Sequence, residues 1–253
     1  MKRLILLGIV LFLCLPVAVY AASIGGAETQ GKGKLAIGLE QELSFERDLE
    51  FDKANWDLAA EGVSIEKMEI DKLYRTMVKA SYGLIDNWDI YLKLGVADVK
   101  GKADALEEGE AYTGIYDGKN AFAYGFGTKG TYKLGDWLIG ADLQYLRHQH
   151  DWTPKGDFVG EGDKITIQEW QVAPYVGYKI GNFIPYLGVK YSDLRAKAEW
   201  GGPDAGNWEK AKADDNFGVF LGTDYKIGKN FSLNIEGRFV DETAMSFGAT
   251  YKF

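Results

Sequence analysis

The chain of 253 residues has a single cysteine, Cys14, and this cysteine lies in a segment that we expect to be removed. A basic start at Lys2 and Arg3 precedes an apolar run to about residue 22, which is the arrangement of a secretory signal peptide. Small side chains at the two positions that signal peptidase reads favour cleavage after Ala21, so residues 1–21 are the predicted signal peptide. An uncleaved N-terminal membrane anchor is the alternative. Without Cys14 the mature chain has no thiol, which excludes disulfides and thiolate metal sites.

Long hydrophobic runs are absent from the rest of the chain. No later segment reaches the roughly eighteen apolar residues that a membrane-spanning helix needs. Stretches rich in Pro or Ser are also missing, so the remaining chain of about 230 residues fits a single domain. The formal net charge is −8, and it becomes −10 when Lys2 and Arg3 leave with the signal peptide. An acidic chain of this kind is a poor partner for nucleic acid, and we expect none.

The chain is rich in alternation of apolar with small or polar residues. Near its end Met245, Phe247, Ala249, Tyr251 and Phe253 share one parity, whereas small or polar residues take the other. Successive side chains of a strand point to opposite faces. The segment therefore predicts a strand with one apolar face.

The last three residues, Tyr251 to Phe253, have near copies upstream, each followed by a short turn of Gly, Asp or Asn. A second aromatic residue then opens the next strand, so each copy predicts a hairpin. The copies are spaced by 50, 46 and 47 residues, which indicates a repeating architecture. The aromatic residues around these turns form a predicted periplasmic girdle, which consists of Tyr82, Trp88, Tyr132, Trp137, Tyr178, Phe183, Tyr225, Phe231, Tyr251 and Phe253.

Aromatic side chains at one common level suit a membrane–water interface. A soluble barrel or sandwich would have to bury them instead. The bulky parity offers about five large side chains on each of about ten strands, and a barrel of roughly eight strands is only just wide enough for its own side chains. The other parity is rich in Gly, Ala, Ser and Lys, which suits an interior. The pattern therefore favours a barrel whose bulky face lies in lipid.

We predict an all-β fold, a ten-stranded antiparallel transmembrane β-barrel over residues 34–253, with eight or twelve strands as alternatives. Residues 22–33 are expected to form a loose periplasmic lead-in. Four tight turns face the periplasm, and long loops face outward, of which the first two are acidic and cover about residues 47–69 and 98–121. Lipid satisfies no backbone groups, so the last strand must close the barrel by pairing with the first.

The strand at about residues 165–178 is expected to be irregular at two points. Ile165, Ile167 and Trp170 are all assigned to the lipid face, which requires either a slip of parity such as a β-bulge produces or a strand boundary at another position. Pro174 cannot donate to a sheet ladder, so it predicts a local break in pairing.

The signal peptide, the repeated Tyr-x-Leu/Ile turns and the C-terminal Tyr251-Lys252-Phe253 resemble the small outer-membrane β-barrel proteins of Gram-negative bacteria, of the opacity-protein and porin-like kind. The resemblance covers essentially the whole mature chain. It implies export through the periplasm to the bacterial outer membrane, where the barrel contacts lipid and lipopolysaccharide. It also implies that the barrel-assembly machinery reads the terminal Phe253. Such families include pores, adhesins, structural anchors and a few enzymes, so the resemblance leaves the activity and the oligomeric state open.

The charged residues of the interior parity predict a small porin-like passive channel for ions or small solutes. Charged rings select ions by sign, and the basic excess in this set predicts a mild preference for anions. In the alternative, the same charges pair with one another, Glu40 and Glu42 with Arg75 and Lys79, and plug the barrel. The predicted pore-lining residues are Lys34, Glu40, Glu42, Arg75, Lys79, Lys93, Lys129, Asp142, Glu169, Lys190, Asp224, Glu236 and Arg238.

A plugged barrel would be a non-conducting structural or adhesive surface protein. Aromatic residues in the predicted loops supply the basis for adhesion, because aromatic side chains are enriched at binding surfaces. They could equally extend the outer girdle. These residues are Trp56, Tyr112, Tyr116, Trp152, Trp200 and Trp208.

An outer-membrane protease is a further, minor alternative. Ten-stranded proteases of that family resemble this chain in strand number and use an Asp–His pair opposite an Asp pair. The candidates here are His148, His150 and the adjacent Asp214 and Asp215, but the family's Asp-x-His order is absent. We therefore expect no enzyme. The two histidines lack a third ligand nearby, so no metal site and no cofactor are expected.

Overall fold

The computed structural model describes residues 23–55, 57, 62–151, 163–201 and 205–253. The predicted signal peptide, residues 1–21, lies outside the described residues. Every element in the described part is a β-strand, and no helix there is long and apolar enough to cross a membrane. The strands are β1 (Leu35–Ala54), β2 (Val63–Ile85), β3 (Trp88–Glu107), β4 (Glu110–Leu134), β5 (Trp137–Asp151), β6 (Lys164–Tyr178), β7 (Phe183–Glu199), β8 (Trp208–Ala213), β9 (Phe217–Ile227), β10 (Phe231–Phe239) and β11 (Thr243–Lys252).

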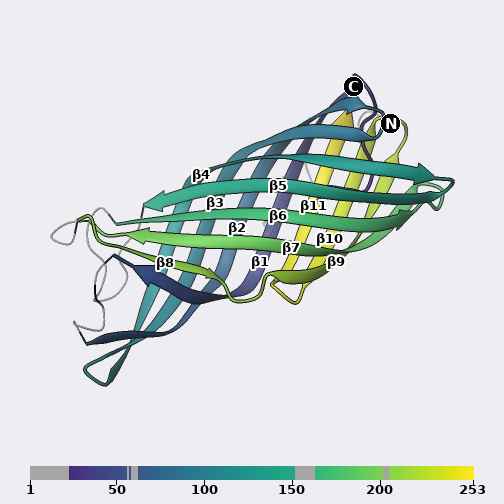
Figure 1. The fold of residues 1–253 in the computed structure, drawn as a ribbon. Helices are drawn as coiled ribbons and strands as arrows, with labels where there is room; N and C mark the ends of the chain where they lie inside the picture. Colours follow the sequence, from purple (N-terminus) through teal and green to yellow (C-terminus); the bar gives the residue numbers. More distant parts are fainter. Residues whose placement is uncertain (1–22, 56, 58–61, 152–162, 202–204) are drawn as a thin grey trace.

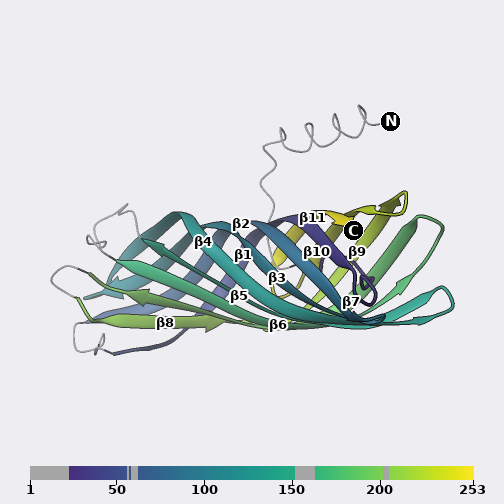
Figure 2. The ribbon, with the colours of Figure 1, turned by 90° about the horizontal axis from the view of Figure 1, so that it is seen from above.

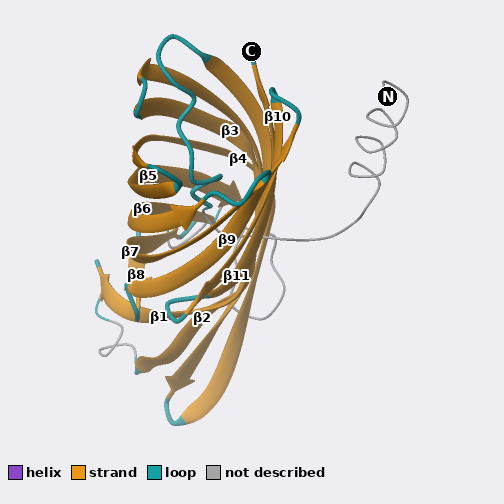
Figure 3. Ribbon diagram, turned by 90° about the vertical axis from the view of Figure 1, so that its right-hand side faces the viewer, coloured by secondary structure: helices purple, strands orange, loops and turns teal. Residues whose placement is uncertain are grey.

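Ten of these strands form a closed antiparallel ring. Neighbours along the chain pair from β1 to β7, then β7 pairs with β9, β9 with β10 and β10 with β11. The seam joins β11 to β1, and the backbone N–H of Phe253 donates to the carbonyl of Leu35 over 2.9 Å. Figures 1 and 3 show the strands curving around one interior. The prediction of a ten-stranded antiparallel barrel closed by its last strand is confirmed.

The short strand β8 gives the barrel a second tier. It pairs with β7 on one side, from Arg195 outward, and with β1 on the other, from Leu49 outward. At this level β8 stands where β9, β10 and β11 have ended, so the upper ring consists of β1 to β7 and β8. Figure 2 shows β8 at the end away from the C-terminus. We call this upper tier, with the long ends of β1 to β7, the outer extension.

The two acidic segments predicted as loops are mostly strand. β1 runs on to Ala54 and β2 begins at Val63, while β3 and β4 continue to a tight turn at Glu108 and Gly109. The alternation fades there because these strands leave the apolar belt and present charges on their surfaces. Lys102 illustrates the pattern, with its ammonium nitrogen 2.9 Å from a carboxylate oxygen of Glu69. The prediction of loops over 47–69 and 98–121 is therefore wrong.

Charge pairing in the outer extension depresses the pKa of Glu69 to about 2. Hydrogen bonds from Lys67 and Lys102 to its carboxylate are the main causes. Lys67 and Glu69 lie beyond the apolar belt, on the part of β2 that precedes Tyr74, and Lys102 lies beside them on β3. Cross-strand pairs of opposite charge are the units that stabilise such a two-sided polar sheet.

The outer face of the lower ring carries an apolar belt. Large apolar side chains with one parity are exposed along every strand of the ring, and among them Leu187 is 61% and Phe217 is 70% exposed. The girdle residues lie on this face at the end with the tight turns, where all are exposed except Phe231, which is half-buried. Their contact with a membrane interface stays a prediction.

Strand β6 keeps one register along its whole pairing with β5, so the expected bulge between Ile167 and Trp170 is absent. Ile165 and Ile167 face inward and are buried, which corrects their assignment to the lipid face. Their parity is that of the interior, and the interior of the outer extension is apolar at this height. Around Pro174 the β6–β7 ladder skips a step, as expected for a residue that lacks an N–H donor.

Candidate functional site

The described part of the lead-in, residues 23–33, lies inside the barrel end that carries the tight turns. Ser23, Ile24, Ala27 and Thr29 are buried, and Thr29 donates its hydroxyl to the carbonyl of Asp86 over 3.0 Å. The expectation of a loose lead-in is wrong for these residues. We call residues 23–33 the N-terminal plug.

Buried lysines of the barrel wall hold the plug by its carbonyl groups. The ammonium of Lys93 donates to the carbonyl of Ser23 over 3.1 Å, and that of Lys79 donates to Ile24 over 3.2 Å. Lys129 donates to the carbonyls of Ile24 and Gly26. Each ammonium thereby gains the hydrogen-bond acceptors that burial would otherwise deny it.

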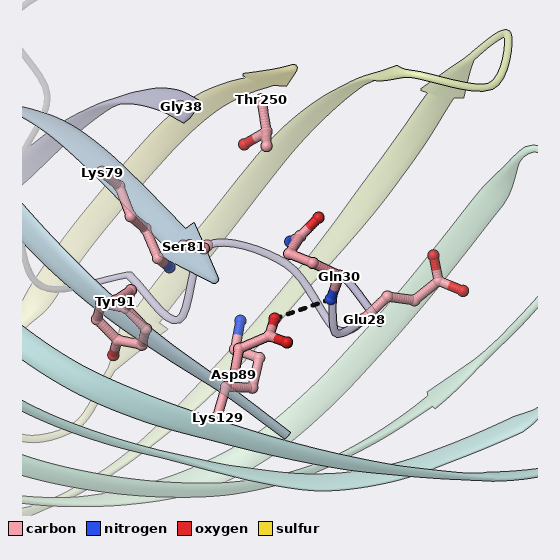
Figure 4. Close-up of a pocket in the computed structure, with 10 residues that line it drawn as sticks. Glu28, Gln30, Gly38, Lys79, Ser81, Asp89, Tyr91, Lys129 and Thr250 are labelled. Carbon is pink, nitrogen blue, oxygen red and sulfur yellow. Dashed lines mark hydrogen bonds between the residues drawn. The ribbon is translucent and has the colours of Figure 1, made fainter. Parts of the chain in front are cut away.

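Buried carboxylates of the wall accept the plug's N–H groups. Ser23 donates to Glu42 over 2.7 Å, Ala27 to Asp224 over 2.8 Å and Gln30 to Asp89 over 2.8 Å. Figure 4 shows Gln30 and its bond to Asp89 among the surrounding wall side chains. The plug thus satisfies charges of both signs with its own backbone.

Small residues let the plug fit this tightly. Gly25 and Gly26 have φ angles of +64° and +96°, a region that glycine adopts without strain. A Cβ at Gly25 would collide with Glu40 and Lys79, and one at Gly26 would collide with Asp224. Ile24 and Ala27 add apolar contact with a cluster at this level, whose other members are Leu138, Ala173, Tyr175, Ile184, Tyr186 and Phe220.

Above the plug, a first ionic layer crosses the interior. Lys93 lies 2.7 Å from Glu40, and Lys79 lies 3.2 Å from the other oxygen of the same carboxylate. Arg75 lies 3.4 Å from Glu42, its direct cross-strand neighbour. The predicted pairing of Glu40 and Glu42 with Arg75 and Lys79 is present.

A second ionic layer lies farther out. The Glu169 carboxylate bridges two guanidinium groups, 2.7 Å from Arg47 and 3.2 Å from Arg75. Lys190 lies 2.9 Å from Asp241 and also contacts Glu242. Hydrogen bonds from Arg47 to Ser192 and from Ser192 to Asp241 link these pairs into one network.

The interior parity placed twelve of the thirteen predicted pore-lining residues in the buried interior, and their lining of an open pore stays a prediction. Lys34 is the exception, because it is exposed just before β1 begins. The sequence missed Arg47, Asp241 and Glu242. A register shift between Ser44 and Glu46 turns Arg47 inward, and the two acids lie in a link that carries no alternation. The only sign in the sequence that Arg47 faces inward is that it shares one parity with the apolar residues that follow the register shift.

With these additions the two layers are nearly balanced in charge, which removes the basic excess expected from the sequence. All of these residues are buried. The cations are Arg47, Arg75, Lys79, Lys93, Lys129, Lys190 and Arg238, and the carboxylates are Glu40, Glu42, Asp142, Glu169, Asp224, Glu236, Asp241 and Glu242.

An apolar layer fills the outer extension above the ionic layers. Trp200 and Leu49 pack against its edge. The predicted loop residues Trp56 and Trp152 lie outside the described residues. The buried members of the layer are Ile70, Leu73, Val99, Ile165, Ile167, Leu194, Ala196, Ala198 and Ala213.

Glu209 of β8 is buried next to this layer, opposite Ala198 on β7 and Ala54 on β1. Burial raises its pKa to about 7, and no opposing charge offsets the effect. A carboxyl group in such surroundings favours its neutral form.

Two spaces beside the N-terminal plug are small. One of about 10 Å³ lies between the plug, Lys79 and Tyr91, which is room for about one water molecule. Another, of about 100 Å³, lies at the turn end beside Lys226 and Asn230. Neither reaches across the ionic layers.

The candidate protease residues do not come together. His148 and His150 face inward on β5, and their ring nitrogens Nδ1 and Nε2 are 2.7 Å apart. Asp214 and Asp215 line a different cavity, with Arg47 and Asp241, where β8 leaves β1. Among the described residues, no group of three or more His, Cys, Asp and Glu could hold a metal ion.

Comparison with known proteins supports one family. The profile of the outer membrane protein beta-barrel domain matches residues 86–253. No curated protein matches the chain.

Solved structures similar to this chain include the outer membrane protease OmpT from Escherichia coli, 13% identical, with 87% of this chain and 97% of that chain covered and a TM-score of 0.51. Another is the outer membrane protein OprG from Pseudomonas aeruginosa, 15% identical, with 89% and 99% covered and a TM-score of 0.45. At these identities the likeness concerns the fold alone.

Proposed function

This chain belongs to the family of outer membrane protein beta-barrel domains, and we propose that it is a closed, non-conducting surface protein of the bacterial outer membrane. The observation that carries the proposal is the occupied interior. The N-terminal plug, the ionic layers and the apolar layer follow one another along the barrel axis.

Each layer opposes ion passage in its own way. The plug replaces water at the turn end with backbone groups that bind Glu42, Lys93 and Asp224. The ionic layers offer a passing ion no unpaired ring of one sign, because Glu169 is already shared by Arg47 and Arg75. The Ile, Leu, Val and Ala side chains of the apolar layer offer a dehydrated ion no ligand.

A porin-like channel is the competing function, and the same charged residues would serve it if they faced water. Twelve of the predicted pore-lining residues are buried, and the space beside Lys79 and Lys129 has room for about one water molecule. These observations favour the plugged barrel over the channel. No observation favours a protease, because His150 and Asp214 lie on different parts of the wall.

The outer extension is the part that we propose to be presented at the cell surface. Short turns of outer-membrane barrels face the periplasm, so the long ends of β1 to β4 and β8 face outward. They form a continuous strand-built surface in which Lys67 and Lys102 pair with Glu69. A rigid polar surface of this kind suits a structural or adhesive role.

Solute efflux from vesicles that contain a measured amount of folded protein tests the proposal. Vesicles with the protein should release trapped ions and small sugars no faster than empty vesicles. Folding and insertion are checked by heat-dependent migration of the barrel on gels and by its strand-type circular dichroism. Efflux that rises in proportion to inserted protein would establish a water-filled lumen and overturn the closed barrel.

A further inference from the structure

The outer extension carries a concentration of cations on its outward face, across β5, β7, β8 and β1. This is unexpected in a chain with a formal net charge of −8. A concave region of about 460 Å³ lies between these side chains, and Thr166, Gln168 and the acidic Asp52 and Glu199 also line it. We call its cations the basic surface, which consists of Lys53, Arg147, Arg195, Lys197 and Lys210.

The pairing register sets like charges directly opposite one another. Lys210 of β8 is the cross-strand partner of Lys197 on one side and of Lys53 on the other. One row nearer the apolar belt, Arg195 is opposite Lys212, which lies 3.2 Å from Glu50. Like charges in such positions destabilise a sheet, so the arrangement indicates an anionic ligand that compensates them.

Protein carboxylates compensate only part of this charge. Arg195 lies 2.9 Å from Asp193, and Lys197 lies 2.8 Å from Glu199. Arg147 and Lys53 make no ion pair with any described residue. Lys210 contacts the ring of Trp208, with its nitrogen 4.5 Å from the ring centre, and likewise pairs with no described carboxylate.

The position of the basic surface identifies the kind of anion. On β5, Arg147 follows Tyr145 by two residues on the same face, a step of about 7 Å. Tyr145 and Trp170 form an aromatic pair on the outer face, with ring centres 4.8 Å apart. Aromatic side chains of this kind mark the headgroup level of a membrane. The cations therefore lie at or just outside the headgroups of the outer leaflet.

We propose that the basic surface binds the phosphate groups of a phosphorylated glycolipid of the outer leaflet, such as lipopolysaccharide. Its acyl chains pack on the aromatic side chains of β4, β5 and β6 below. Arg147 and Arg195 each offer a planar fork of N–H donors that suits phosphate oxygens, while Lys53 and Lys210 add point charges. The proposal does not depend on whether the lumen conducts.

A lipid fits this surface better than a free anion does. Arg147 and Gln168 line the concave region, and Tyr145 and Trp170 lie two residues from them on the same faces of β5 and β6. One molecule with both phosphate and acyl groups can therefore use both parts. An inorganic phosphate would use only the cations, and a neutral lipid would use only the aromatic side chains.

Native mass spectrometry of the full folded protein in detergent, titrated with purified lipopolysaccharide, tests the proposal. The test variant is Lys53→Gln/Arg147→Gln/Lys210→Gln, which removes three cations that pair with no carboxylate in the described part of the chain, so no acid there loses a partner. Each such cation attracts the anionic headgroups, so loss of all three should lower the affinity by at least roughly ten-fold. The same lipopolysaccharide after enzymatic dephosphorylation should bind the wild-type protein as weakly as the intact lipid binds the variant.

The matched control is Lys72→Gln/Lys179→Gln/Lys229→Gln, which removes the same charge at exposed positions outside the basic surface. It should bind lipopolysaccharide like the wild-type protein. Equal affinity of wild-type and test variant would overturn the proposal, as would equal binding of the dephosphorylated lipid. Displacement of the lipid by millimolar inorganic phosphate would assign the site to a free anion and also overturn it. Heat-dependent gel migration confirms that each variant is folded.

Discussion

At the scale of single residues, Glu169 is the carboxylate that two arginines of the ionic layers share. It lies within 3.2 Å of two buried guanidinium groups, those of Arg47 and Arg75. Glu169→Gln should leave both cations without their shared counter-charge and lower the free energy of unfolding by about 3–5 kcal/mol. Urea-induced unfolding in lipid vesicles measures this change.

Glu199→Gln is the control for that substitution, because Glu199 pairs with Lys197 over 2.8 Å on the outer surface. Exposed pairs contribute about 0–1 kcal/mol, so this variant should unfold almost like the wild-type protein. Equal destabilisation by the two substitutions would contradict the ionic layer as a buried network.

Glu209 predicts that folding stability falls as pH rises, whereas an acid paired with a cation has the opposite effect. Its pKa is about 7 in the folded chain, against an ordinary value of 4.5. The folded state therefore binds more protons than the unfolded state between these values, and stability falls as pH rises through this range. Hydrogen exchange of the β8 segment should quicken between pH 5 and 8 beyond its intrinsic dependence. Glu209→Gln should remove this excess, and an unchanged profile in the variant would assign it to another group.

At the scale of elements, the link between β10 and β11 contains a strained residue. Val240 has a φ angle of 88°, in a region that β-branched side chains rarely adopt, and its side chain is 70% exposed. Val240→Gly should therefore stabilise the barrel by about 1 kcal/mol, since relief of strain exceeds the entropic cost of glycine. Val240→Ala, which keeps a Cβ, should recover less than half of this gain in the same urea unfolding measurement. A loss of stability in the glycine variant would contradict the strain.

Alternation made the strands of the lower ring predictable, because one face meets the apolar belt and the other the interior. It placed Glu42 opposite Arg75 and brought the last strand to the first. Alternation could not predict the outer extension. Some strands there are polar on both faces, and on β6 Ile165 faces an apolar interior instead of lipid. The plug was beyond prediction for a different reason. Its small residues bind through their backbone, and backbone groups have no sequence pattern.

At the scale of the whole molecule, the plug and the upper layers should seal the barrel independently. Deletion of residues 23–30 removes the carbonyl acceptors of Lys93 and the N–H donor to Glu42. Water should then enter the turn end, but efflux should stay at the background level because the Arg47–Glu169 layer and the apolar layer remain.

Engineered cysteines measure this directly, since the mature chain is expected to lack a thiol of its own. Ala173→Cys lies beside the plug and Ala196→Cys lies in the apolar layer, and both positions are buried. In the deletion variant a water-soluble thiol reagent should label position 173 and spare position 196. Labelling of both positions, or efflux through the deletion variant, would show that the plug alone closes the barrel.

The N-terminal plug also constrains the order of steps in barrel assembly. The plug is continuous with β1, and β1 forms the seam with β11, the last strand to be made. Residues 23–33 must therefore already lie on the concave side of the curling sheet when the seam closes, or else thread in afterwards through the turn end. In the first case they act as a template, because Glu42, Lys93 and Lys129 gain backbone partners before the opposite wall arrives. In that case the N-terminal plug is the template around which the barrel closes.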